Sequence, residues 1–192
     1  QKGADGELWF AHLEGLLRYD GLEVVEFPYE EMPKDRIGRV TVSSEGDIFM
    51  LSNQELVIFQ GDRYLKIHAE GENYFLKDTE LAEYRDGRMI VATSEGLYEI
   101  VGNELRRIDS DLGIVDSLLV DSEDRLWAAS KEDSQIKVFD IVEREGGLAT
   151  ELIYAFEKEG RSAIAPVLHL DLSDRVWVID PDEDDRCYVY EN

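Results

Sequence analysis

The pattern of apolar and turn-forming residues repeats five times along the chain. Each repeat opens with a short polar segment that carries Gly or Asp at its fourth position and a bulky apolar residue at its seventh. Gly and Asp tolerate a positive φ angle, so a tight turn between two strands fits the fourth position. The five segments are Gly3–Trp9, Ser43–Phe49, Tyr84–Ile90, Asp121–Trp127 and Asp171–Trp177.

Short runs rich in β-branched and aromatic residues fill the stretches between these turns, which is typical of strands. The run that follows each turn segment is Gly15–Tyr19, Glu55–Phe59, Gly96–Ile100, Gln135–Phe139 or Arg186–Tyr190. A further run is Leu22–Phe27, Arg63–Ile67, Glu104–Ile108 or Leu148–Phe156. The run before the next turn is Ile37–Val42, Thr79–Tyr84, Ile114–Val120 or Pro166–Leu170. The chain therefore predicts four strands in each unit and no helix of any length.

Four antiparallel strands in a unit of about 40 residues are the size of a β-propeller blade. We predict an all-β fold, a β-propeller or a segment of one, with about five four-stranded blades. The expected units are about 1–36, 37–78, 79–113, 114–164 and 165–192. One sheet cannot bury both of its faces alone, so the bulky seventh-position residues are expected between neighbouring blades.

The first and last units are incomplete in this pattern. The first lacks its innermost strand and the last lacks its outermost one, and these lie at opposite edges of a blade. One therefore cannot replace the other. We expect a segment of a larger propeller, completed by the rest of that propeller or by a second copy; the alternative is a chain that closes irregularly.

The composition restricts the partners. The 44 Asp and Glu outnumber the 20 Lys and Arg, for a net charge of −24. Such a surface repels phosphate, so binding to nucleic acid or to an anionic membrane is not expected. The sequence contains no run long and apolar enough for a transmembrane helix and no basic-then-apolar signal pattern at residues 1–10. The single Cys187 excludes an internal disulfide and is expected to be a small core residue.

Residues 5–20 resemble the two-component regulator propeller repeat, with Asp-Gly-Glu-Leu-Trp followed by Gly-Leu-Leu-Arg-Tyr-Asp. Residues 86–100 look like the same repeat, and residues 121–129 and 171–179 match its first half. The match is imperfect, because Ala11-His12 and Ala92-Thr93 stand where the family has Gly-Thr. The resemblance implies an extracytoplasmic, periplasmic or extracellular sensor region of a bacterial histidine kinase or hybrid two-component system, in a family often tied to carbohydrate use.

Propellers tend to bind ligands on the face that carries the loops between blades and between the second and third strands. The candidate ligand-binding residues on these loops are Tyr29, Arg36, Tyr74 and Arg161, and His169 joins them from an inner strand. An Arg in so acidic a chain can hold a carboxylate or sugar hydroxyls, and a loop aromatic can stack on a sugar ring. The alternative is that the arginines pair with nearby acids and the aromatics cover blade edges.

The sequence carries no catalytic motif, and its three histidines lie in three different units without metal-ligand spacing. Asp180, Asp182, Asp184 and Glu191 fit a calcium-loop template, but Asp185 stands where the template requires Gly. We therefore predict no catalytic residues, no metal ligands and no cofactor. The preferred function is a non-enzymatic sensor that binds an oligosaccharide or another small molecule. The alternative is a lactonase- or lyase-like propeller enzyme, with a metal in the central channel held by His169 and inner-strand carboxylates. The scattered inner-strand candidates are Arg39, Glu80, Glu83, Asp116 and His169.

Overall fold

The computed structural model describes residues 2–3, 5–12, 14–31, 37–52, 55–68, 81–85, 87–130, 135–157, 166–180 and 186–191. These residues form 18 β-strands in five antiparallel sheets of three or four strands. The all-β propeller fold with incomplete first and last blades is thereby confirmed. In this part of the chain there is no helix long and apolar enough to cross a membrane.

Each sheet is one blade, and hydrogen-bonded neighbours follow chain order. Blade one contains β1 (Leu8–His12), β2 (Gly15–Tyr19) and β3 (Val24–Pro28). Blade two contains β4 (Arg39–Val42), β5 (Ile48–Leu51), β6 (Glu55–Gln60) and β7 (Arg63–His68). Blade three contains β8 (Leu81–Tyr84), β9 (Arg88–Thr93), β10 (Gly96–Val101) and β11 (Glu104–Arg107). Blade four contains β12 (Ser117–Val120), β13 (Arg125–Ala129), β14 (Gln135–Arg144) and β15 (Gly147–Glu157). Blade five contains β16 (Val167–Leu170), β17 (Arg175–Asp180) and β18 (Arg186–Glu191).

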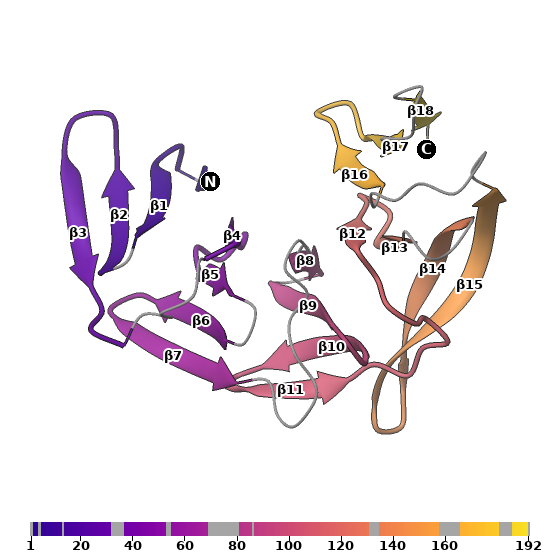
Figure 1. Cartoon of the computed structure of the whole chain (residues 1–192), viewed down its shortest axis with the longest axis horizontal. Coiled ribbons are helices and arrows are strands. Elements are labelled where there is room, and N and C mark those ends of the chain that lie inside the picture. The colour runs from indigo at the N-terminus through magenta and orange to yellow at the C-terminus, as the bar shows by residue number, and fades with distance from the viewer. Residues whose placement is uncertain are drawn as a thin grey trace.

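The blades follow one another along an open arc (Figure 1). The first strands of the later blades, β4, β8, β12 and β16, line the inside of the arc, and the last strands β3, β7, β11 and β15 lie outside. Blades one and five stand on either side of the opening, with the N-terminus and C-terminus nearby.

The turn that opens each repeat explains the sequence periodicity. We call it the repeat turn: Gly3–Glu7, Ser43–Asp47, Tyr84–Arg88, Asp121–Arg125 and Asp171–Arg175. Its fourth residue has a positive φ in all five blades: Gly6 at 89°, Gly46 at 89°, Gly87 at 78°, Asp124 at 63° and Asp174 at 62°. The prediction that Gly or Asp stands there to permit a tight turn is confirmed.

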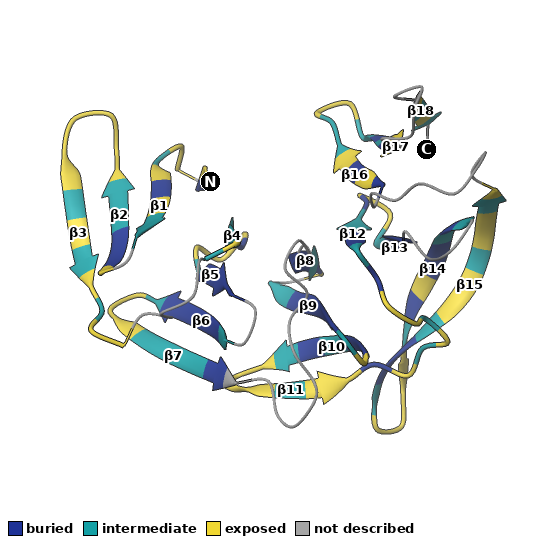
Figure 2. Cartoon of the chain, in the orientation of Figure 1, coloured by how far each residue is buried: buried dark blue, intermediate teal, exposed yellow. Residues whose placement is uncertain are grey.

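The hydrophobic core is divided among the contacts between neighbouring blades. Trp9, Phe49, Ile90 and Trp127 occupy the seventh repeat position and are buried against the following blade. Figure 2 shows buried residues concentrated on the middle strands, and exposed ones on outer strands such as β11 and β15. The expected role of these seventh-position side chains as core between blades is confirmed for those four.

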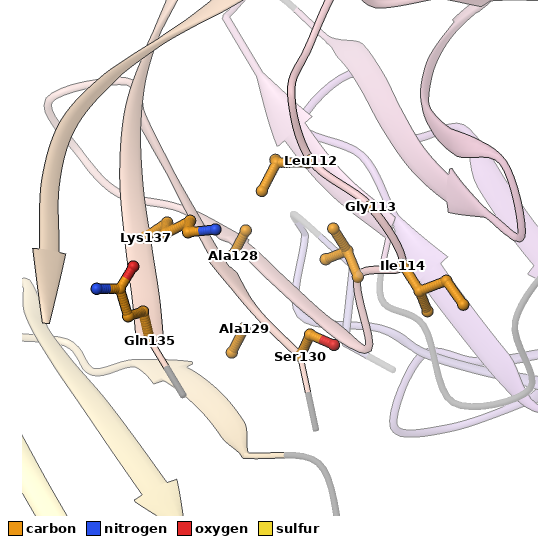
Figure 3. A pocket seen from close by; sticks show the side chains of 9 residues that line it. Leu112, Gly113, Ile114, Ala128, Ala129, Ser130, Gln135 and Lys137 are labelled. Atoms are coloured by element: carbon orange, nitrogen blue, oxygen red, sulfur yellow. The ribbon is translucent and has the colours of Figure 1, made fainter. Parts of the chain in front are cut away.

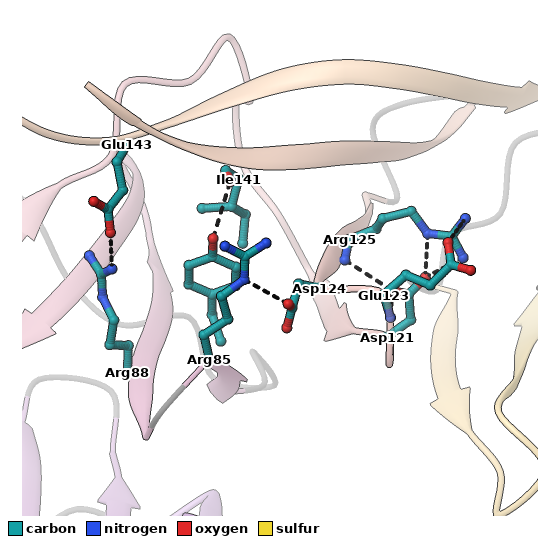
Figure 4. Close-up of polar contacts among 9 residues, drawn as sticks. Arg85, Arg88, Asp121, Glu123, Asp124, Arg125, Ile141 and Glu143 are labelled. Carbon is teal, nitrogen blue, oxygen red and sulfur yellow. Dashed lines mark hydrogen bonds and ion pairs between the residues drawn. The ribbon is translucent and has the colours of Figure 1, made fainter.

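Polar contacts also join successive blades. The Tyr84 hydroxyl donates a buried hydrogen bond of 3.1 Å to the Ile141 carbonyl oxygen, from blade three to blade four. Between the same blades, Arg85 Nε is 2.6 Å from Asp124 Oδ2 (Figure 4). At the equivalent turns, the Ser44 hydroxyl donates to Glu83 and the Ser122 hydroxyl donates to Asp174. At the three boundaries from blade two to blade five, the repeat turn of one blade is therefore linked to the next blade.

A buried carboxylate stabilises the repeat turn of blade four. Asp121 Oδ1 accepts hydrogen bonds from the backbone N–H groups of Glu123 and Arg125 at 3.0 and 2.9 Å. Asp121 Oδ2 accepts from Arg125 Nε at 2.8 Å (Figure 4). The same oxygen accepts from Trp127 Nε1 at 2.7 Å. Asp171 repeats this arrangement in blade five. Because the carboxylate accepts a hydrogen bond from Trp177 Nε1, the pKa of Asp171 is held well below its usual range.

Candidate functional site

A pocket of about 260 Å³ opens on the face of the arc that carries the loops between blades (Figure 3). It lies where the connection from β11 to β12 passes the ends of β13 and β14. The sequence predicted ligand-binding loops on this face, and one of them, 109–113, supplies two lining residues. The lining residues are Leu112, Gly113, Ile114, Val115, Ala128, Ala129, Ser130, Gln135 and Lys137.

Small side chains create the space in this pocket. Lys137 is half-buried on β14, where its paired neighbours across the sheet are Ala128 on β13 and Ala155 on β15. An alanine on either side leaves room for the long lysine stem to lie over the sheet. In Figure 3 the Lys137 ammonium group lies beside Ala128 and points toward Leu112 of the connecting loop.

The other polar groups of the pocket are held in place by neighbouring acids. The Ser130 hydroxyl donates to Asp116 Oδ2 at 3.3 Å, and Gln135 Nε2 donates to Glu157 Oε1 at 2.6 Å. The pocket thus combines an apolar wall, a lysine ammonium group and oriented hydroxyl and amide groups. This combination is typical of a site for a small polar ligand.

Among the predicted ligand-binding residues, Tyr29 packs against a blade edge. Its ring stacks on Tyr64 with 4.3 Å between ring centroids and 12° between ring planes. Burial raises the pKa of Tyr29, and raises the pKa of Tyr64 to about 12. The Tyr64 hydroxyl donates to the Phe27 carbonyl oxygen at 2.5 Å. Tyr29 therefore takes part in the contact between blades one and two.

His169 is exposed on β16, opposite Trp177 on β17. Its neighbours Leu168 and Leu170 point to the other face of the sheet and pack against blade four. His169 and Tyr29 belong to the two end blades of the arc, so the structure does not bring them into one site. The other three predicted ligand-binding residues, Arg36, Tyr74 and Arg161, lie outside the described residues.

The inner-strand acids of the enzymatic alternative already have polar partners. Glu83 accepts hydrogen bonds from the Ser44 backbone N–H at 2.8 Å and from the Ser44 hydroxyl, and Asp116 accepts from Ser130. Arg39 is half-buried on β4. Glu80 and the loop 181–185, with most of the calcium-loop template, lie outside the described residues.

Within the described ranges, one group of three side chains has the donor types and spacing to hold a metal ion. It consists of His12, Glu14 and Glu26 in blade one, whose ligand atoms lie within 4.8 Å of one another. His12 Nε2 is 3.7 Å from Glu26 Oε1. The group involves neither His169 nor the inner strands on which the enzymatic alternative depends.

Cys187 corrects an expectation from the sequence. It was predicted to be a core residue, but it is exposed on β18. Within blade five, Tyr188 and Tyr190 point toward blade four, so the alternating Cys187 and Val189 point to the other face of the sheet. The sequence indicated the alternation of side chains along this strand, but it did not show which face of the sheet is covered by another blade.

Sequence reasoning missed Lys137, Gln135 and Ser130. The run Gln135–Phe139 was recognised as a strand, but its lysine gave no sign that it faces a pocket. The signal available was a single Lys between Ile136 and Val138 in a Lys-poor chain. Only the position of the connecting loop 109–113 turns that lysine into a pocket residue.

The fold and the pocket define a propeller-type protein with a candidate small-molecule site on its loop face. No protein-family model and no curated protein sequence matches the chain. Solved structures do match in fold. Virginiamycin B lyase from Staphylococcus aureus is 13% identical with a TM-score of 0.69, over 100% of this chain and 68% of the lyase chain.

The extracellular domains of two B. thetaiotaomicron proteins assigned as hybrid two-component systems are also similar. One is 15% identical with a TM-score of 0.60, and the other is 17% identical with a TM-score of 0.52. Both alignments cover 100% of this chain, which spans 28% and 31% of those chains. These similarities show the propeller fold, and they agree with the repeat resemblance found in the sequence.

Proposed function

We propose that this chain is a non-enzymatic sensor propeller segment that binds a small ligand in the pocket around Lys137. The observation that carries the proposal is the pocket itself, in which an ammonium group lies beside an apolar wall on the face where propellers bind ligands. In a chain with a net charge of −24, a lysine placed inside a pocket favours a negatively charged or hydroxyl-rich molecule.

The ligand class that fits this lining is a sugar or short oligosaccharide end that carries a carboxylate. The carboxylate would accept a charge-assisted hydrogen bond from Lys137 Nζ. Ring hydroxyls would meet Ser130 and Gln135, and the apolar sugar face would pack on Ala128 and Val115. The pocket volume of about 260 Å³ limits the bound part to roughly one sugar unit.

The biological setting we propose is the extracytoplasmic sensor region of a bacterial two-component signalling protein. The repeat resemblance of residues 5–20 and 86–100 supports it, as does the fold shared with extracellular domains of hybrid two-component systems. In that setting ligand binding to the propeller would be passed to a signalling partner.

The test compares Lys137→Met with wild-type protein in calorimetric titrations with glucuronate, galacturonate and the matching neutral sugars. Methionine keeps much of the stem volume but removes the charge. We expect the uronates to bind wild-type protein and Lys137→Met to bind them about 10- to 100-fold more weakly, the range for a lost charge-assisted hydrogen bond. Lys2→Met, which removes an exposed lysine in blade one, is the control and should bind like wild type.

Equal affinity for uronates and neutral sugars, or unchanged affinity in Lys137→Met, would contradict the proposed ligand and site. The lyase-like enzymatic alternative has the fold shared with virginiamycin B lyase in its favour. Following the ligand by NMR during the same titrations separates the two functions, because an enzyme would convert the ligand and a sensor would leave it intact.

A further inference from the structure

The floor of the Lys137 pocket belongs to two rows of side chains that run across blade four. Residues that pair across antiparallel strands point to the same side of a sheet. The first row, which we call the lysine row, is Leu118, Ala128, Lys137 and Ala155. The second row lies two residues further toward the loop face, roughly 7 Å away along the strands. We call it the acid-backed row, and it is Asp116, Ser130, Gln135 and Glu157.

The acid-backed row has a carboxylate at each end. Asp116 Oδ2 accepts from the Ser130 hydroxyl at 3.3 Å, and Glu157 Oε1 accepts from Gln135 Nε2 at 2.6 Å. A hydroxyl has a single hydrogen, so Ser130 meets a pocket ligand through its oxygen. Figure 3 shows the Gln135 amide nitrogen on the side away from Ala129. The row therefore presents acceptor oxygens with negative charge behind them.

The lysine row carries the opposite charge. Lys137 supplies an ammonium group, and the other three members of this row are apolar. The pocket floor is therefore positive at one row and negative at the next. A ligand that fits both rows carries an anionic group and a cationic group separated by about the spacing of the rows.

We propose that the pocket selects an amino sugar acid, a pyranose ring with a carboxylate at one end and an amino group at the other. The inference rests on the proposed function and specifies its ligand. The carboxylate meets Lys137, and the protonated amine donates to Ser130 Oγ beside the Asp116 carboxylate. In 2-amino-2-deoxyglucuronate the two groups stand at opposite ends of the ring, which matches the separation of the rows. An α-amino acid carries both charges on one carbon and cannot span them.

The charge around the pocket favours the added amine. A ligand with a carboxylate alone is repelled by Asp116 and Glu157 and by the net charge of −24 on the chain. A protonated amine is attracted by the same charges. Its attraction offsets the repulsion that the carboxylate of the ligand meets.

The experiment compares four sugars that differ only at the second and sixth carbons of the ring. They are 2-amino-2-deoxyglucuronate, glucuronate, glucosamine and glucose, titrated by calorimetry at a mildly acidic pH that keeps the sugar amine protonated. We expect wild-type protein to bind 2-amino-2-deoxyglucuronate about 10-fold more tightly than glucuronate, the gain from one more charge-assisted hydrogen bond. Glucosamine lacks the carboxylate for Lys137 and should bind more weakly than 2-amino-2-deoxyglucuronate.

The variant Asp116→Asn/Glu157→Gln removes both charges of the acid-backed row and keeps an acceptor oxygen on each side chain. Its preference for 2-amino-2-deoxyglucuronate over glucuronate should fall below about 3-fold, while glucuronate binds as tightly as before or more tightly. Asp140→Asn/Glu151→Gln is the control, because these two exposed acids pair across the same two strands outside the pocket lining. It should keep the wild-type preference, and thermal melting checks that both variants fold.

Equal affinity of wild-type protein for 2-amino-2-deoxyglucuronate and glucuronate would overturn the inference and leave the proposed function in place. An undiminished preference in Asp116→Asn/Glu157→Gln would overturn it too, because the two acids would then not be its source. Absence of binding by either uronate would contradict both the inference and the proposed function.

Discussion

At the scale of single residues, the Asp of the repeat turn does more than permit the turn. Asp121 and Asp171 each hold two backbone N–H groups, an arginine and a tryptophan indole. The two sites differ in burial, since the Asp121 side chain is fully buried and that of Asp171 is 19% exposed. Blade five covers the first site, while the second lies at the end of the arc.

Asp121 and Asp171 make the same hydrogen bonds at different burial. Comparing them tests how burial changes the contribution of these bonds to the free energy of unfolding. Asp121→Ala removes the acceptor of the buried Trp127 indole N–H, of two backbone N–H groups and of Arg125 Nε, and we expect a loss of about 2–4 kcal/mol in the free energy of unfolding. Asp171→Ala exposes the equivalent donors to water, so we expect a clearly smaller loss than for Asp121→Ala. Urea denaturation of both variants checks the order. Equal losses would show that blade five does not protect the Asp121 site.

At the scale of elements, the repeat turn is limited by backbone conformation. Gly46 has a φ of 89°, and a Cβ added there would meet no atom within 4 Å. Any penalty for a side chain at this position is therefore backbone strain alone. Asp124 and Asp174 occupy the same position at 63° and 62°, so this conformation is accessible to Asp.

We expect Gly46→Ala to lower the free energy of unfolding by about 1–2 kcal/mol, the usual penalty for placing alanine at positive φ. Gly113→Ala is the control, because Gly113 has ordinary φ and a Cβ there would also meet no atom within 4 Å. In thermal denaturation, the melting temperature of Gly113→Ala should equal that of wild type or lie slightly above it. Equal melting temperatures for Gly46→Ala and Gly113→Ala would show that a side chain at the positive φ of the repeat turn does not destabilise the fold.

At the scale of the whole molecule, acidic charge surrounds a set of thin apolar layers. The ion pairs that cross between blades, such as Arg85 with Asp124 and Arg88 with Glu143, are exposed to solvent, so each contributes little to the free energy of unfolding. Repulsion within a net charge of −24 acts over the whole surface. Added salt weakens both the ion pairs and the repulsion. We expect the weaker repulsion to change stability more, so that salt stabilises the protein.

The melting temperature should therefore rise by roughly 2–4 °C between about 0.02 and 0.3 M NaCl, which corresponds to about 1 kcal/mol for a chain of this size. Glu145→Lys, at the exposed turn between β14 and β15, lowers the net negative charge by two and should reduce this rise. Differential scanning calorimetry measures both. A melting temperature that falls with added salt would show that the exposed ion pairs contribute more than the net repulsion.

Much of the fold could be predicted because its signals are local. The five turns, the strand runs and the missing edge strands follow from where Gly, Asp and the bulky seventh-position residues stand. The candidate pocket depends on contacts between distant segments, and the sequence did not indicate it. Tyr29 was proposed for ligand binding but stacks on Tyr64, a blade away, and Lys137 was not proposed at all.

The sequence by itself determined the repeat, the blade size and the face on which loops gather, because turn chemistry and strand alternation act between residues a few positions apart. The tertiary structure alone decided which faces are covered. Cys187 and Phe10 alternate like core residues but are exposed, because burial in a propeller requires the sheet of a neighbouring blade. In the same way Lys137 became a pocket residue only when the loop 109–113 from blade three was placed beside it.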